Sequence, residues 1–250
     1  MTEQTPEPFE AVGEDWQTAL AVVAHPDDLE YGAAAAVARW TAQGKRVVYA
    51  MVTSGEAGID SMDPELCGPL REAEQIASAA VVGVDTVEFL RHPDGVLEYS
   101  LPLRRDIARL VRRHRPDVVI TTNYRETYGG VFPNQADHIA AGRATLDAAR
   151  DAGNRWVFRE LLAEGLEPWD GVQMVLAAGS PDGRHAVDTT ETFALGVASL
   201  KEHRAYLAGL GDHAMADPEE FLESFARMTG SRLGVRYASG FEVISLRPPV

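Results

Sequence analysis

The sequence predicts a single α/β domain with a Rossmann-like, doubly wound and mainly parallel sheet that carries helices on both faces. Short apolar segments alternate along the chain with helical segments of about a dozen residues, as in successive βαβ units. The segment 46–53, RVVYAMVT, is almost continuously apolar, which is typical of a strand buried on both faces of a parallel sheet. The chain has 250 residues, 45% of them hydrophobic, and no segment has the composition of a linker or a repeat, so we expect one domain.

Each predicted element begins or ends at a local signal. Residues 18–24 form an apolar, β-rich segment, and the Ala-rich stretch after it has helical spacing and ends at Gly44. A loop with Gly, Asp and Pro follows the second strand, and the next helix ends at Gly83. The helix after the third strand ends before Pro116, because proline cannot continue a helix. The predicted strands cover residues 18–24, 46–53, 86–90, 117–122, 173–177 and 241–246, and the predicted helices cover residues 29–43, 70–82, 102–114, 136–152 and 190–207.

Composition and charge exclude several classes of protein. Acidic residues outnumber basic ones by 38 to 23, so the net charge is −15, and nucleic acid and anionic membranes are poor partners. No apolar stretch approaches the roughly 20 residues of a membrane span, and residues 1–14 are predicted to be a flexible acidic tail without the features of a signal peptide. Cys67 is the only cysteine, which excludes a disulfide framework and a thiolate zinc cluster. We therefore expect a soluble, cytoplasmic protein, and the sequence leaves open whether it forms a homo-oligomer.

Polar side chains follow the first predicted strand directly. His25, Pro26, Asp27 and Asp28 lie where doubly wound sheets bind their ligands, beyond the carboxyl end of a strand. A single Asp at the start of a helix is usually a cap, but that interpretation explains neither His25 nor a second carboxylate. His25 and Asp28 are three residues apart across the turn, so they can converge on one metal ion. Asp27, which lies between them in the sequence, then points away from the metal position and is free to accept a proton.

A second polar cluster, PNQADH at residues 133–138, lies between the fourth strand and the next helix. His138 is a candidate third ligand, because the loops after neighbouring parallel strands meet at one edge of a sheet. Two histidines and one carboxylate leave coordination positions open for water, as a catalytic zinc ion requires, although another divalent transition metal would also suit. Asp137 is either a helix-start residue or a partner that orients a histidine.

Four motifs together resemble the PIG-L/LmbE-like de-N-acetylase family. In chain order they are AHPDD at residues 24–28, REAE at residues 71–74, HPDG at residues 92–95 and PNQADHIAAG at residues 133–142. The similarity extends from about residue 18 to residue 246 and is strongest up to Gly142. Beyond that point KEHR, at residues 201–204, is similar to a family helix that carries a histidine near the pocket. The resemblance implies a deacetylase domain over residues 15–250.

The resemblance also implies a function, that of a zinc hydrolase which removes acetyl groups from N-acetylated amino sugars, such as N-acetylglucosamine derivatives, or from sugar conjugates. His25, Asp28 and His138 match the metal ligands of the family, and Asp27 matches its general base. In such a mechanism the metal activates a water molecule, Asp27 accepts the water proton, and the hydroxide attacks the amide carbonyl.

Five further residues are expected in the site. Arg71 matches a substrate-contacting arginine of the family, and Asp94 matches a polar residue of its pocket loop. Gln135 stands where some members carry a histidine that helps to stabilise the oxyanion, and an amide can donate a hydrogen bond but cannot release a proton at neutral pH. Tyr128 is an additional donor by its position in the same loop, and His203 is a candidate proton donor to the leaving amine.

Two other interpretations stay open. A set of two histidines and one carboxylate also serves non-haem iron oxygenases, and anaerobic turnover with zinc alone would distinguish the hydrolase from them. A non-catalytic sugar-binding relative could share the fold, although a binding protein has no need of Asp27 beside an open metal site. The sequence does not identify the acylated sugar, which the loop 55–68 and the region beyond Asn154 are expected to select.

Overall fold

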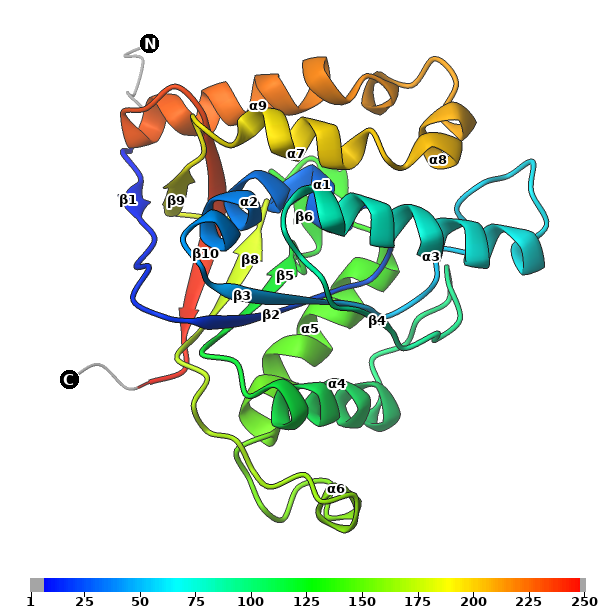
Figure 1. The fold of residues 1–250 in the computed structure, drawn as a ribbon, viewed down its shortest axis with the longest axis vertical. Helices are drawn as coiled ribbons and strands as arrows, with labels where there is room; N and C mark the ends of the chain where they lie inside the picture. Colours follow the sequence, from blue (N-terminus) through cyan, green and yellow to red (C-terminus); the bar gives the residue numbers. More distant parts are fainter. Residues whose placement is uncertain (1–6, 248–250) are drawn as a thin grey trace.

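The computed structural model describes residues 7–247, and they form an eight-stranded sheet with helices on both faces (Figure 1). The strand order is β1-β9-β10-β8-β5-β2-β3-β4. The run from β8 through β5, β2 and β3 to β4 is parallel, whereas β10 is antiparallel to both of its neighbours. The predicted α/β fold with a mainly parallel sheet is therefore confirmed.

Strands and helices alternate along most of the chain. Up to the end of the fifth helix, the elements are β1 (Glu10–Ala11), β2 (Thr18–Val23), α1 (Asp28–Gly32), α2 (Ala34–Ala42), β3 (Arg46–Met51), α3 (Pro64–Val81), β4 (Val87–Phe89), α4 (Leu101–His114), β5 (Val118–Thr122), β6 (Thr127–Tyr128), β7 (Phe132–Pro133) and α5 (Ala136–Asp151). Beyond it they are α6 (Glu160–Ala163), β8 (Met174–Ala178), β9 (His185–Asp188), α7 (Phe193–Leu200), α8 (Arg204–Gly209), a 3-10 turn (Ala214–Ala216), α9 (Pro218–Leu233) and β10 (Ala238–Ser245).

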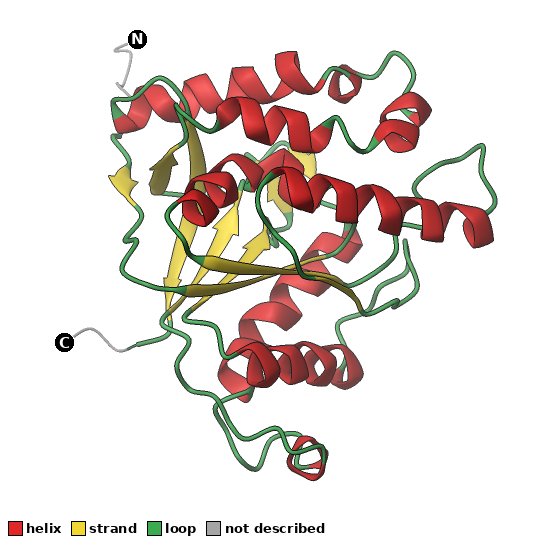
Figure 2. Cartoon of the chain, in the orientation of Figure 1, coloured by secondary structure: helices red, strands yellow, loops and turns green. Residues whose placement is uncertain are grey.

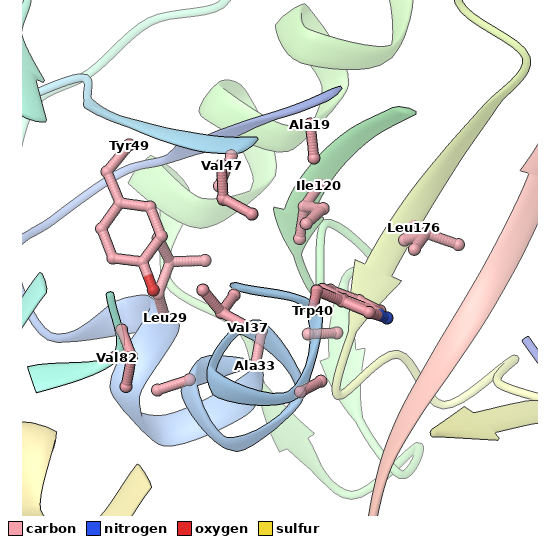
Figure 3. Packing of buried hydrophobic residues seen from close by; sticks show 14 of the residues in the cluster. Ala19, Leu29, Ala33, Val37, Trp40, Val47, Tyr49, Val82, Ile120 and Leu176 are labelled. Atoms are coloured by element: carbon pink, nitrogen blue, oxygen red, sulfur yellow. The ribbon is translucent and has the colours of Figure 1, made fainter. Parts of the chain in front are cut away.

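The sheet is the middle of three layers, which Figure 2 shows as strands between two groups of helices. Alternate side chains of β2 enter two separate apolar cores, because successive residues of a strand point to opposite faces. Ala21 and Val23 pack with α1 and α2 on one side, and Leu20 and Val22 pack with α4 and α5 on the other. Figure 3 shows the first of these cores, with Trp40 beneath the sheet. Burial on both faces explains why the parallel strands are continuously apolar.

The start of the chain departs from the prediction of a flexible tail over residues 1–14. Residues 1–6 lie outside the described residues, but β1 pairs with β9, and Val12 is buried. The carboxylate of Glu14 accepts hydrogen bonds from the indole of Trp40 (2.8 Å) and from Arg39 (3.0 Å). The prediction is wrong for residues 10–14, because their partners come from strands and helices far along the chain.

Three helices differ from their predicted ranges. The helix expected over residues 29–43 is divided at Ala33, whose φ of −129° leaves the helical region. The helix expected over residues 190–207 is divided between α7 and α8, at His203. The third helix, α3, begins before Pro69, because Asp63 caps the Glu65 N–H at 2.9 Å. The sequence did not predict β9, α9 or the β6–β7 hairpin.

The topology places two loops side by side. In the sheet β2 lies between β3 and β5. From β2 the chain first adds β3 and β4 on one side and then adds β5 on the other side, so β2 is the point at which the strand order reverses. The loops that follow β2 and β5 therefore leave the same edge of the sheet as neighbours, at the position where such sheets bind ligands. No helix in the described part of the chain is both long enough and apolar enough to cross a membrane.

Candidate active site

The loops after β2 and β5 bring His25, Asp28 and His138 together. Asp28 is the first residue of α1, and its Oδ2 accepts a hydrogen bond from the backbone N–H of His25 (2.9 Å). Its Oδ1 lies 2.9 Å from Nε2 of His138, and Oδ2 lies 3.7 Å from Nδ1 of His25. The two ring nitrogens are 3.2 Å apart. One donor atom from each residue thus lies within 4.8 Å of the others, as binding of a single metal ion requires.

The surroundings of His25 determine which nitrogen faces this point. Its Nε2 lies 3.1 Å from Oδ1 of Asp94 and 3.4 Å from Oδ2 of Asp137. Asp137 also accepts the backbone N–H groups of Gly95 (2.7 Å) and Leu97 (3.0 Å), so its carboxylate is fixed. Because an ionised carboxylate only accepts hydrogen bonds, the ring proton belongs on Nε2, and Nδ1 presents its lone pair to Asp28 and His138. The resemblance implied a pocket-loop role for Asp94, and the structure places it against His25.

The ring of His138 is oriented in the same way. Its Nδ1 lies 3.0 Å from Oδ1 of Asn134 and 3.0 Å from the hydroxyl of Tyr128. The amide nitrogen of Asn134 donates to the carbonyls of Asn123 (2.7 Å) and Arg125 (2.9 Å), so its oxygen must face the histidine. Nδ1 therefore carries the proton, and Nε2 offers its lone pair. Sequence reasoning missed Asn134, although it precedes His138 by four residues within the matched motif.

The electrostatics of the site favour a cation between these groups. Burial alone would lower the pKa of His25, but the carboxylates of Asp137, Asp28 and Asp94 outweigh it and raise that pKa well above its usual value. Burial would raise the pKa of Asp28, yet His138 and His25 hold it below its ordinary range. Two lone pairs and a carboxylate repel one another unless positive charge, from a proton or a metal ion, lies between them. The residues present therefore fit a divalent metal ion with nitrogen and oxygen ligands.

Asp27 lies beside this set, in an unusual backbone conformation. Its φ is +86°, in the left-handed region that residues other than glycine rarely adopt. Its N–H donates to Oε1 of Gln75 (2.9 Å), and its Oδ2 accepts a hydrogen bond from Nη2 of Arg71 (2.5 Å). Burial raises the pKa of Asp27 to about 6, although Arg71 lowers it. A carboxylate with a raised pKa next to a metal site is suited to accept a proton.

Arg71 is enclosed by protein on most sides. It is 2% exposed, its Nη2 also donates to the carbonyl of Pro26 (2.6 Å), and its guanidinium lies 4.3 Å from the ring centre of Tyr206. A Cβ at Gly58 would lie 2.3 Å from Nη1, so that nitrogen faces the loop after β3. The residue predicted to contact substrate is thus paired first with Asp27.

Gln135 and His203 differ in their exposure. The side chain of Gln135 is exposed just before α5, and within the described residues it makes no hydrogen bond to the site. The ring of His203 is fully buried, with Nε2 3.7 Å from Oε2 of Glu30, an ion-pair distance too long for a hydrogen bond. Burial would lower the pKa of His203, but the Glu30 carboxylate and Asp27 raise it.

The part of the chain that forms this site matches a known family. The profile of the PIG-L family, described as GlcNAc-PI de-N-acetylase, matches residues 20–149. Over 242 residues the chain is 27% identical to the diacetylchitobiose deacetylase of Thermococcus kodakarensis, covering 95% of this chain and 85% of that protein. Over 182 residues it is 30% identical to the 1D-myo-inositol 2-acetamido-2-deoxy-alpha-D-glucopyranoside deacetylase of Thermobispora bispora, covering 60% of this chain and 55% of that protein.

A solved structure agrees in fold with this chain. The N,N'-diacetylchitobiose deacetylase from Pyrococcus horikoshii matches it with a TM-score of 0.84 and 24% identity, over 93% of this chain and 85% of that one. The family profile covers more than half of the 250 residues, so the chain belongs to the PIG-L de-N-acetylase family. The match to the Thermobispora protein spans only about half of that protein's length.

Proposed function

We propose that this protein is a metal-dependent hydrolase, most suited to zinc, that removes the acetyl group from an N-acetylated amino sugar or sugar conjugate. The observation that carries the proposal is the convergence of two histidine lone pairs and the Asp28 carboxylate, with Asp27 held beside them. Membership of the PIG-L family and the deacetylase relatives support the same reaction. A zinc ion at this set would supply a Lewis acid to the amide carbonyl and to a water molecule.

The contacts of Asp27 support a proposal in which its two carboxylate oxygens have separate tasks. Oδ2 is held by Arg71, whereas Oδ1 has no hydrogen-bond partner among the described residues. Oδ1 therefore accepts a proton from the water that attacks the amide carbonyl carbon. The amide C–N bond then breaks, acetate forms, and Asp27 returns the proton to the leaving amine.

We propose Tyr128 and Gln135 as donors to the oxyanion. Burial raises the pKa of Tyr128 to about 12, so its hydroxyl keeps its proton at neutral pH and can donate it as a hydrogen bond. Gln135 is the second donor, from the exposed start of α5. Because His203 is enclosed, we infer that it acts through its charge on Asp27 and Glu30 and does not touch the leaving amine.

The substrate class follows from the relatives, which are named for diacetylchitobiose and for a glucosaminide of myo-inositol. We propose a small N-acetylated sugar or glycoconjugate as substrate. Nη1 of Arg71, which faces the loop near Gly55 and Gly58, is the candidate contact to such a ligand. A guanidinium donates hydrogen bonds to sugar hydroxyl oxygens without accepting any.

A direct test uses the purified chain, stripped of metal and reloaded with zinc under anaerobic conditions. N,N'-diacetylchitobiose and N-acetylglucosamine are the probes, and both free amine and acetate are measured. We expect amine and acetate in equal amounts from at least one probe, and none from the metal-free protein. Turnover that requires iron and dioxygen would favour the oxygenase interpretation, and sugar binding without acetate release would favour a binding protein.

A further inference from the structure

The left-handed backbone at Asp27 needs an explanation, because a non-glycine residue keeps such a conformation only where its surroundings enforce it. The Asp27 side chain is held by Arg71, but its backbone is held by a different group. Its N–H donates to Oε1 of Gln75, which lies on α3 and is fully buried. We propose that Gln75 is a positioning residue for the reaction, which fixes the Asp27 turn and so aims the carboxylate; this rests on the proposed role of Asp27 as the base.

The orientation of the Gln75 amide is fixed by the chemistry of its neighbours. A backbone N–H can only donate, so the amide oxygen must face Asp27. The amide nitrogen donates to Oε1 of Glu30 at 3.0 Å, and a carboxylate oxygen accepts. A flipped amide would place donor against donor and acceptor against acceptor. The amide group of Gln75 therefore has one favourable orientation between Asp27 and Glu30.

Glu30 is held in turn by residues of two other helices. Ser78, one turn after Gln75 on α3, donates to Oε1 of Glu30 at 2.6 Å. Ser199 on α7 lies 2.8 Å from the Ser78 hydroxyl. All four side chains are buried, so water is a poor replacement for any of these bonds. A polar chain thus runs from α7 through Glu30 and Gln75 to the backbone of Asp27.

Gln75 is the only member of this chain that is bonded to Asp27, and through that bond it acts on the direction of the Asp27 side chain. A change in φ is a rotation about the N–Cα bond, which turns the Cα–Cβ bond relative to the N–H bond. Loss of the hydrogen bond that holds the N–H therefore allows φ to relax and the carboxylate to change direction. A displacement of about 1 Å in a reacting group can reduce a rate about 100-fold. Neither Gln75 nor Glu30 matches a residue that the family motifs assigned to the site, and neither belongs to the metal-ligand set.

The test compares three variants in the full-length, zinc-loaded protein with N,N'-diacetylchitobiose as the probe. Gln75→Met removes both hydrogen bonds at similar volume. Gln75→Glu keeps an acceptor for the Asp27 N–H but places a second carboxyl against Glu30. Ser78→Ala is the matched control, because it removes a buried hydrogen bond to Glu30 from the same helix and leaves the bond to Asp27.

We expect Gln75→Met to lower kcat about 10–100-fold, with KM and zinc content unchanged. Ser78→Ala should lower Tm and keep kcat within about twofold, because the hydrogen bond from the Asp27 N–H to Gln75 stays in place. Gln75→Glu should retain more kcat than Gln75→Met despite a lower Tm. Hydrogen exchange of the Asp27 amide should be faster in Gln75→Met than in Ser78→Ala, whatever the activity. A purely structural role predicts instead that kcat follows Tm across the three variants.

Two results would overturn the positioning role. One is a folded Gln75→Met protein with wild-type kcat, and the other is equal loss of kcat in Gln75→Met and Ser78→Ala. If Gln75→Met does not fold, a folded Gln75→Glu protein with as little activity as Asp27→Asn contradicts the proposal, and retained kcat supports it. Adding Gln75→Met to Asp27→Asn should cost less than about a further twofold in rate. An active Asp27→Asn protein would instead refute the base assignment itself.

Discussion

The two halves of the chain contribute to one sheet in different ways. Through α5, each parallel strand from β2 to β5 ends at the same edge of the sheet, and the connection between one such strand and the next returns the chain to the opposite edge. Beyond α5, β10 runs antiparallel to β8 and β9, and α7 to α9 pack on the other helices and on the sheet's far edge. The first half provides His25, Asp28, His138 and Asp27, whereas the second provides His203.

The difference shows how the site is built. Ligand atoms come from loops that converge at the carboxyl edge of parallel strands, where backbone ends are free to turn toward a ligand. The second half contributes polar groups that contact α1, where the Glu30 carboxylate lies close to His203 and Ser199. We therefore propose that the chemistry resides in the first half of the chain and that the second half stabilises it. The following predictions test that division.

The largest effect is expected from His138→Ala, in the first half. The variant removes one of three converging ligand atoms, so zinc content should fall close to zero and acetate release should be lost with it. His92→Ala is the matched control, since His92 opens a similar His-Pro-Asp motif but pairs with Asp106. It should keep full zinc content. Full zinc occupancy in His138→Ala would show that the metal binds elsewhere.

His203→Gln should destabilise the protein without removing zinc. It leaves the Glu30 carboxylate buried and without its cationic partner, a loss that typically costs about 3–5 kcal/mol. The expected readouts are a lower midpoint of denaturant unfolding and an unchanged zinc content in the folded protein. Loss of zinc at conditions where the variant is folded would contradict the division between the two halves.

Asp94→Asn should weaken metal binding while the ligands stay in place. The variant replaces a carboxylate that orients His25, and such outer partners typically contribute about 10–100-fold in metal affinity. Competition with a zinc chelator measures the change. Asp106→Asn, which alters the equivalent partner of His92, serves as control and should leave zinc affinity as in the wild type. If Asp94→Asn raises KM and leaves zinc affinity unchanged, Asp94 contacts substrate as the resemblance implied.

The stabilising effect of His203 should depend on pH. Glu30 and Asp27 raise its pKa in the folded protein, while Arg71 and burial lower it, with a net increase above about 6.5. A raised folded-state pKa means that the stability from the protonated ring is complete below about pH 6.5 and is lost as pH rises through the folded value. The difference in Tm between wild type and His203→Gln should thus be larger at about pH 6 than at about pH 9. An equal difference at both pH values would indicate a neutral ring.

The sequence predicted the first half of the fold well, for a physical reason. His25, Asp28 and His138 follow strands whose parallel pairing is encoded in local apolar patterns, so their meeting at one edge follows from the topology. Strand β9, helix α9 and the break at His203 were not predicted, because antiparallel return strands and helix breaks depend on distant packing.

The polar groups around the ligands were harder to predict. Glu30 and Gln75 are buried on two helices, α1 and α3, that both pack against α7. Asn134 acts through an amide orientation that only the carbonyls of Asn123 and Arg125 determine. A single sequence shows the residue type at such positions but not the partner. Asp137 could be suggested from the sequence as a residue that orients a histidine, but Glu30, Gln75 and Asn134 are found only in three dimensions.

The central claim is that Asp27 and Asp28, adjacent in sequence, have different tasks. The most direct measurement determines zinc content and acetate release from N,N'-diacetylchitobiose for Asp27→Asn and Asp28→Asn side by side. Asp27→Asn should keep its zinc and lose about 10²–10⁴-fold in kcat, as expected when a positioned base is removed. Asp28→Asn should lose zinc and activity together, because its carboxylate faces both histidines. Near-wild-type turnover in Asp27→Asn, or zinc loss equal to that of Asp28→Asn, would contradict the account.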